Sequence, residues 1–126
     1  MKKEISELID NRDIKAAVKL TFAGERKCFG PGTVMLLREI ERCGNVREAC
    51  EYCGFSYSKG WTIIRRCEDG LGLRIVERQA GGQAGGAARV SEDGRRLLTV
   101  YEKLEAEIAE AAGSRFRELM EEEFDL

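Results

Sequence analysis

The chain has 126 residues, of which 43% are apolar and 35% charged, and its formal net charge is −2. This length supports one compact core but leaves no room for a second globular unit. The sequence has no apolar run of about 18 residues that could span a membrane and no apolar signal-peptide core, so we expect a cytoplasmic protein that does not engage a membrane.

The first third of the chain is predicted to be scaffold. Residues 1–12 favour a short amphipathic helix. Residues 14–22 and 26–29 favour a β-hairpin around a turn at 23–25, with Val18, Leu20 and Phe22 on one face. Pro31 is well placed in the first turn of a helix that Gly44 ends. The apolar positions of this helix would support the following elements from behind: Leu36, Leu37, Ile40 and Cys43.

The segment from Asn45 to Ser56 has the pattern of a helix followed by a tight turn. Asn45 is a good N-cap, and Glu48 stands three residues later, as a capping box requires. Gly54 is a typical helix-ending glycine, and Ser56 can cap a second helix. The buried face of the first helix is predicted from spacings of three and four residues: Val46, Ala49, Cys50 and Cys53.

The second helix, from Tyr57 to about Gly70, separates into two faces. One face is predicted to be buried and comprises Gly60, Trp61, Ile64, Cys67 and Leu71. The other face mixes hydroxyl groups with long cations, which can bond to base edges and neutralise phosphates. Its members are Ser58, Lys59, Thr62, Arg65, Arg66 and Asp69. A solvated amphipathic helix would look similar, but the turn before this helix and the basic element after it favour a recognition helix.

That next element is a pair of β-prone runs, residues 74–78 and 88–90, around a glycine-rich loop. A phosphate-cradling loop would precede a helix and carry Gly-Lys-Ser/Thr, which is absent here. A flexible linker would also be rich in glycine, but the flanking strands favour a folded hairpin. Two helices, a turn and a hairpin in this order predict a winged helix-turn-helix in a mainly α chain with small β-hairpins.

This layout indicates double-stranded DNA as the partner. The predicted DNA-binding residues are Ser56, Tyr57, Ser58, Lys59, Thr62, Arg65, Arg66, Arg78, Gln83 and Arg89. The acidic net charge is unevenly distributed, because residues 54–98 carry eight Lys or Arg against five Asp or Glu. Residues 99–126 carry three against nine. Cations gathered in one region are typical of a DNA-binding chain whose total charge is negative.

A helix is predicted to follow the wing, with Ser91 as its cap and acidic residues in its first turn. Its apolar positions follow a heptad-like spacing, for which we favour a homodimer seam over packing within one domain. The seam comprises Leu97, Tyr101, Leu104 and Ile108, with Ala111 after them. Gly113 and Ser114 are expected to interrupt this helix. We therefore expect a DNA-binding domain over 1–112, whose dimerisation helix spans about 91–112, and a short amphipathic helix or tail over 113–126.

Five cysteines in a chain without a secretory signal argue against a disulfide framework. A four-thiolate zinc or iron–sulfur site is conceivable from Cys43, Cys50, Cys53 and Cys67. These cysteines occupy predicted core positions, however, where cysteine behaves as a small apolar residue. We expect no metal and no cofactor. We also expect no enzymatic activity, because the chain has no histidine and no recognisable nucleophile motif.

Several of these motifs together resemble the N-terminal DNA-binding domain of molybdate-responsive ModE regulators, which is similar to that of LysR-type regulators. The resemblance covers roughly residues 14–108. It is carried by Gly30-Pro31-Gly32, Gly54-Phe55-Ser56-Tyr57, Trp61, Val76-Glu77-Arg78 and the double Gly-Gly loop before Ala88-Arg89-Val90-Ser91. The chain departs from the family at Gln83, where lysine is common, and at Ala84 and Ala87, where glycine is common. The resemblance implies a dimeric transcriptional regulator whose third core helix reads the groove.

The effector-binding domain of full-length members has no counterpart in these 126 residues. We therefore expect a molybdenum-related regulator that binds no small-molecule effector by itself. Two alternatives stay open. One is a metal- or redox-responsive regulator that uses its cysteines, and the other is a protein-interaction module that has lost DNA binding.

Overall fold

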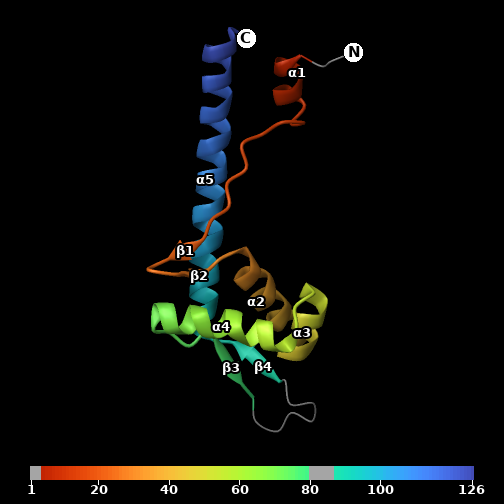
Figure 1. The fold of residues 1–126 in the computed structure, drawn as a ribbon, viewed down its shortest axis with the longest axis vertical. Helices are drawn as coiled ribbons and strands as arrows, with labels where there is room; N and C mark the ends of the chain where they lie inside the picture. The colour runs from red at the N-terminus through yellow and green to blue at the C-terminus, as the bar shows by residue number, and fades with distance from the viewer. Residues whose placement is uncertain (1–3, 80–86) are drawn as a thin grey trace. The chain divides into compact units, whose positions relative to one another are not determined.

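A computed structural model describes residues 4–79 and 87–126, and most of them are helical (Figure 1). The elements in chain order are α1 (Ile5–Asp10), β1 (Phe22–Ala23), β2 (Lys27–Phe29), α2 (Pro31–Cys43), α3 (Val46–Cys53), α4 (Tyr57–Leu71), β3 (Val76–Arg78), β4 (Ala88–Val90) and α5 (Glu92–Phe124). The strands form two antiparallel hairpins, β1–β2 and β3–β4. The predicted class, mainly helical with small hairpins and a long C-terminal helix, is confirmed.

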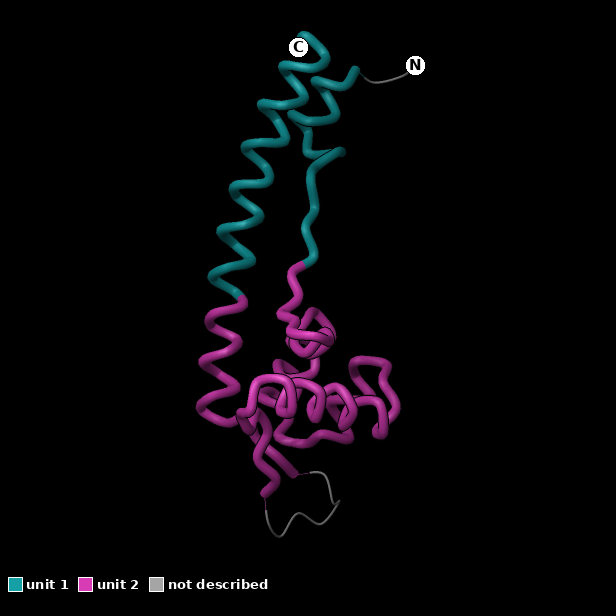
Figure 2. Tube along the Cα trace, turned by 60° about the vertical axis from the view of Figure 1, so that its left-hand side comes forward, with its two compact units in different colours: residues 1–19, 102–126 teal, residues 20–101 magenta. Residues whose placement is uncertain are grey.

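The chain divides into two compact units, which Figure 2 shows in different colours. One unit comprises residues 20–101, and the other comprises residues 1–19 together with 102–126. Within the described ranges, no helix combines the length and the apolar character needed to cross a membrane.

The unit of residues 20–101 has one apolar core, to which α2, α3, α4, both hairpins and the start of α5 contribute. The predicted helix boundaries around the helix-turn-helix are confirmed. Asn45 Oδ1 accepts a hydrogen bond from the backbone N–H of Glu48 at 3.0 Å, and Ser56 Oγ accepts one from Lys59 N–H at 3.0 Å. Gly54 ends α3 with a φ of 77°, which lets the chain turn into α4 without a Cβ clash.

Helices α3 and α4 approach each other closely at Gly60. A Cβ at this position would collide with the Sγ atom of Cys50, which is fully buried in α3. Four of the five residues predicted for the buried face of α4 are buried, namely Gly60, Trp61, Ile64 and Cys67, and the fifth, Leu71, is half-buried against the core. The small residue at position 60 therefore lets α4 pack closely on α3.

The predicted strand over residues 14–22 is wrong for residues 14–21. Only Phe22 and Ala23 pair with β2, opposite Phe29 and Lys27. A strand needs the backbone of a neighbouring strand as its partner. Residues 14–21 have no such partner in β2, because Gly30 and helix α2 follow β2 directly. The Leu20 carbonyl instead accepts a hydrogen bond from the Tyr101 hydroxyl at 2.8 Å.

The predicted interruption at Gly113 and Ser114 is also wrong, because α5 runs unbroken for 33 residues from Glu92 to Phe124. Glycine in a helix interior costs only about 1 kcal/mol relative to alanine. The neighbours on both sides, including Ala112 and Arg115, are good helix formers that offset this cost. Residues 113–124 therefore belong to α5 and do not form a separate final helix.

The second unit joins the N-terminal segment to the C-terminal part of α5. The predicted N-terminal helix is present as α1, in which Ile9 is buried. Arg117 of α5 pairs with Asp10 at 2.8 Å between Nη1 and Oδ1. Residues 14–18 and the α5 residues Ala106, Ala109 and Phe116 line a groove within this unit.

Candidate nucleic-acid interface

The β3–β4 hairpin is the predicted wing, and its root is held by α4 and by the turn between α2 and α3. The Glu68 carboxylate of α4 accepts hydrogen bonds from the N–H groups of Ile75 at 2.8 Å and Val76 at 3.3 Å. The N–H of Ala88 donates to the Gly44 carbonyl at 3.0 Å. These bonds fix where the wing leaves the core. Sequence reasoning missed Glu68, because its partners are backbone groups that only the fold brings near.

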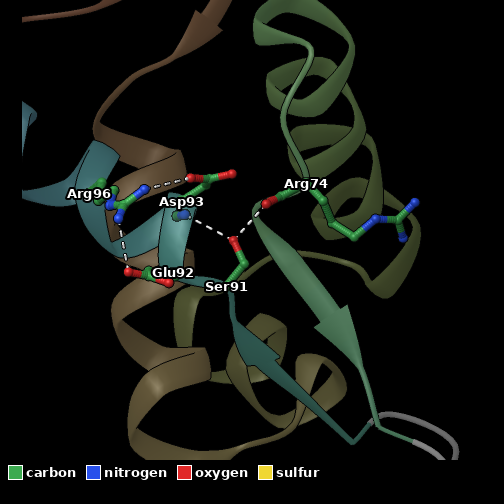
Figure 3. Close-up of polar contacts among 6 residues, drawn as sticks. Arg74, Ser91, Glu92, Asp93 and Arg96 are labelled. Atoms are coloured by element: carbon green, nitrogen blue, oxygen red, sulfur yellow. Dashed lines mark hydrogen bonds and ion pairs between the residues drawn. The ribbon is translucent and has the colours of Figure 1, made fainter.

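Ser91 ties the start of α5 to the same root (Figure 3). Its hydroxyl donates to the Arg74 carbonyl at 2.6 Å and accepts from the Gly94 N–H at 2.9 Å. Arg96 reaches back to Glu92 at 3.0 Å and to Asp93 at 3.5 Å, which completes the first turn of the helix. The predicted Ser91 cap is confirmed. Ser91 has a second role as well, since its bond to the Arg74 carbonyl holds the backbone that leads into β3.

The outward face of α4 is arranged as the sequence predicts. Tyr57 is half-buried at its start, and the remaining members are exposed: Ser56, Ser58, Lys59, Thr62, Arg65 and Arg66. The Thr62 hydroxyl donates to the Ser58 carbonyl at 3.0 Å, which leaves its oxygen as an acceptor for other groups. The face thus presents hydroxyl oxygens near its N-terminal half and guanidinium groups further along.

Among the described residues, no carboxylate neutralises the cations of this face. Lys59, Arg65 and Arg66 form no ion pair with any carboxylate in residues 4–79 and 87–126. Four arginines on α2 and α5 differ, because each pairs with a carboxylate on its own helix: Arg38 with Glu41, Arg42 with Glu39, Arg96 with Glu92 and Arg115 with Glu118. Uncompensated positive charge is therefore available on α4 for an anionic partner.

The predicted wing residues are in three different situations. Arg78 is exposed, and its guanidinium carbon lies 4.2 Å from the centre of the Trp61 ring. Arg89 is exposed but pairs with Glu77 of the neighbouring strand, at 2.8 Å between Nε and Oε2. Gln83 lies outside the described residues. Arg78 is therefore the wing cation that is placed beside α4.

The structure adds Arg47, which sequence reasoning did not single out. This exposed residue of α3 lies over the Tyr57 ring, 4.1 Å from guanidinium carbon to ring centre. The position of Arg47 outside the buried stripe of Val46, Ala49 and Cys50 indicated that its side chain is exposed. Nothing in the sequence indicated that Arg47 would lie beside Tyr57 at the start of α4.

The predicted dimer seam needs a correction at Tyr101. This side chain is only 2% exposed, because it packs against Phe22 and Phe29 at ring-centre distances of 5.5 and 5.6 Å. Leu97 is also packed partly against the same core, together with the fully buried Leu98. Tyr101 is thus covered by its own unit and does not face a second chain. Leu104 is 37% exposed, and Ile108 is half-buried.

The cysteines lie in or beside the core. Cys50 and Cys67 are buried, whereas Cys43 and Cys53 are half-buried. Burial raises the pKa of the Cys67 thiol to about 12 and also raises the pKa of Cys50 and Cys53. These three thiols are therefore protonated and uncharged at neutral pH, as expected of small side chains in an apolar core. Residues 4–79 and 87–126 contain no group of three or more Cys, Asp or Glu placed to hold a metal ion.

Comparisons with known proteins agree with this geometry. No protein-family model matches the chain. The "DNA-binding transcriptional dual regulator ModE" of Escherichia coli (strain K12) is 31% identical over 92 residues, which are 72% of this chain and 35% of that protein. The "Transcriptional regulator ModE" of Yersinia pestis is 29% identical over the same shares. The "Molybdenum-pterin-binding protein MopA" of Rhodobacter capsulatus is 30% identical over 105 residues, which are 83% of this chain and 39% of that protein.

The chain thus spans little more than a third of the length of these relatives. It is distantly homologous to ModE transcriptional regulators, in a manner consistent with their N-terminal region. The names of these relatives describe regulators and a pterin-binding protein and none describes an enzyme.

Proposed function

We propose that this chain is a cytoplasmic transcriptional regulator that binds double-stranded DNA in a sequence-specific manner through α4. The observation that carries the proposal is the exposed face of α4, whose three cations have no carboxylate partner in the described residues. The homology to ModE regulators supports the same function.

In this proposal α4 enters the major groove, which is wide enough for one α-helix. Recognition helices contact base edges mainly with the residues of their N-terminal part. We therefore assign Ser58, Lys59 and Thr62 to base edges. Arg65 and Arg66, further along the helix, are assigned to phosphates or the groove wall. Thr62 would act as an acceptor, because its hydroxyl proton is used within α4.

The wing would contact the backbone beside the groove. Arg78 is suited to this role, since it is exposed and has no carboxylate partner in the described ranges. Arg89 would first have to exchange its bond with Glu77 for a phosphate. We therefore assign the stronger wing contact to Arg78.

We also propose that two copies act together, through the apolar positions of α5 that their own unit leaves uncovered. Leu104 and Ile108 are the predicted seam residues that remain for this role. A twofold dimer would place two α4 helices in successive major grooves, about 34–36 Å apart. Its operator should then contain an inverted repeat.

The test begins with selection of bound duplexes from a pool of genomic fragments, followed by titration of the enriched duplex at several salt concentrations. We expect a recurrent sequence and an affinity that falls steeply as salt rises, because bound phosphates release counterions. Lys59→Ala should weaken specific binding by about 1–3 kcal/mol if the lysine contacts a base.

Arg115→Ala provides the matched control. Arg115 is also an exposed cation, but Glu118 already neutralises it at 2.8 Å. We expect this variant to bind like the wild type. Unchanged affinity in Lys59→Ala, Thr62→Ala and Arg65→Ala alike would show that α4 is not the recognition helix.

A further inference from the structure

We infer that Arg47 is a further DNA-binding residue and that Tyr57 and Trp61 position Arg47 and Arg78 for phosphate contact. We call these two rings the aromatic bridge. The inference rests on the proposed DNA-binding function of α4. It adds a contact from α3 and gives the bridge a role in binding as well as in the core.

Together with the two arginines, the aromatic bridge forms a continuous series of contacts from α3 through α4 to the wing. Arg47 lies 4.1 Å from the centre of the Tyr57 ring, and Arg78 lies 4.2 Å from the centre of the Trp61 ring. The two rings stand one helical turn apart and meet edge to face, with centres 6.4 Å apart and an interplanar angle of 84°. One cation from each neighbouring element is thereby fixed against α4.

Contact with a ring need not occupy the binding edge of a guanidinium. A guanidinium contacts a ring through its flat face, while its five N–H donors point outward in the plane. Both arginines are exposed, and neither forms an ion pair within residues 4–79 and 87–126. Their donors can therefore bind a phosphate without leaving the rings.

Burial of the Trp61 ring gives the aromatic bridge a positioning function. Trp61 is only 9% exposed, and its Nε1 atom has no hydrogen-bond partner among the described residues, so packing alone sets its orientation. An arginine that already rests on a fixed ring loses less side-chain freedom when it binds. The contribution of Arg47 to DNA affinity should consequently depend on the ring of Tyr57.

The chain contains a matched comparison in Arg42. This arginine also lies over a tyrosine ring, 5.3 Å from the centre of Tyr52, but Glu39 neutralises it at 2.6 Å. Both Arg42 and Arg47 thus lie over a tyrosine ring. Of the two, only Arg47 has no carboxylate partner among the described residues, so its charge can attract a phosphate. Arg42→Ala should leave DNA binding unchanged, whereas Arg47→Ala should weaken it.

The experiment is a double-mutant cycle on the duplex selected above, with affinity measured across a salt series. Arg47→Ala should reduce the magnitude of the slope of log K against log salt by about 0.9, the value of one phosphate contact. Tyr57→Phe keeps the ring and should weaken binding less than Tyr57→Leu does. Tyr57→Leu should weaken binding about two- to tenfold, the range for the ordering of one long side chain on binding. In the Arg47→Ala background, Tyr57→Leu should have no further effect.

The wing side has its own readout, because Trp61 is the single tryptophan of the chain. Arg78→Ala should shift the fluorescence emission of the free protein and lower the salt slope, with the thermal midpoint unchanged. Arg42→Ala should change neither quantity. Trp61→Phe keeps an aromatic ring in the core and should reproduce part of the affinity loss.

Provided that the wild type binds its duplex, any of three results would overturn this inference without affecting the proposed function. The first is an unchanged salt slope in Arg47→Ala and Arg78→Ala. The second is that the losses of affinity in Arg47→Ala and Tyr57→Leu add up in the double variant, and the third is an equal loss of affinity in Tyr57→Phe and Tyr57→Leu. The last result would assign the contact to the tyrosine hydroxyl. If no duplex is enriched by the wild type, the proposed function fails and this inference fails with it.

Discussion

At the scale of single residues, burial decides the chemistry of the cysteines. Cys67 is fully buried in the core, and the loss of solvation raises the pKa of its thiol from 9.0 to about 12. Because the thiolate is the reactive form of cysteine, Cys67 behaves at neutral pH as a small apolar side chain. The same cause raises the pKa of Cys50. This argues against the alternative of a thiol-based sensor at these two positions.

The raised pKa of Cys67 predicts how stability changes with pH. Above pH 9 the thiol ionises in the unfolded chain but resists ionisation in the folded one, so the free energy of unfolding falls as pH rises from 9 towards 12. Below pH 9 this contribution is fully present. Urea denaturation measures the free energy of unfolding at about pH 7 and about pH 10.5. Between these two pH values it should fall further for the wild type than for Cys67→Ala. Equal losses in the two proteins would contradict this account.

Residue roles could be predicted where a local pattern determines them. Asn45, Ser56 and Ser91 were identified as caps because the chemistry of a helix start lies within four residues of sequence. Arg47 and Glu68 were missed, because their partners Tyr57, Ile75 and Val76 are brought near only by the packing of α3, α4 and the wing.

At the scale of elements, α5 contains two glycines with opposite environments. A Cβ at Gly94 would lie 2.7 Å from the Ile75 carbonyl oxygen and 2.7 Å from Cγ1 of Val90. A Cβ at Gly113 would meet nothing within 4 Å. The first glycine lets the start of α5 pack on the wing root, whereas the second has no such role.

This difference gives a matched pair of substitutions. Gly94→Ala should destabilise the protein by about 1–3 kcal/mol, because backbone and side chains must shift to admit the methyl group. Gly113→Ala should stabilise α5 by up to about 1 kcal/mol, through helix propensity alone. Urea titration followed by circular dichroism measures both. A destabilising Gly113→Ala would mean that the C-terminal part of α5 is not a regular helix in solution.

The elements that sequence reasoning placed wrongly share one cause. The strand over residues 14–21 was predicted from β-prone composition, but composition does not show that β2 ends at Phe29 and leaves no partner. The heptad spacing of α5 was genuine, but spacing does not show which surface covers the stripe. Near the start of α5 that surface is Phe22 and Phe29 of the same unit, which enclose Tyr101.

At the scale of the whole molecule, the distribution of charge matters more than its sum. The net charge of −2 would by itself disfavour a polyanionic partner. Within residues 20–101, however, the cations of α4 have no carboxylate partner in the described ranges, whereas Arg96 of α5 does. Affinity for DNA should therefore come from local contacts rather than from long-range attraction, and it should decline steeply with salt.

The homodimer is the second whole-molecule property that we expect, and its seam can be tested at Leu104. This residue is 37% exposed, and Val100, four residues earlier on α5, is 54% exposed. Leu104→Glu would bury one carboxylate per subunit without a partner, which strongly disfavours association. Sedimentation velocity at micromolar concentration should show a dimeric wild type and a monomeric variant. The variant should also lose high-affinity binding to an inverted repeat, because one half-site offers half the contacts.

Thr99→Glu is the control for this experiment, since helical spacing places residue 99 about 140° around α5 from residue 104. Thr99 is exposed, so the added charge stays in solvent and the dimer should persist. A monomeric wild type, or a Leu104→Glu variant that remains a dimer, would remove Leu104 from the seam. If Thr99→Glu also dissociates the dimer, added negative charge on α5 rather than burial at position 104 is responsible, and the apolar seam is wrong.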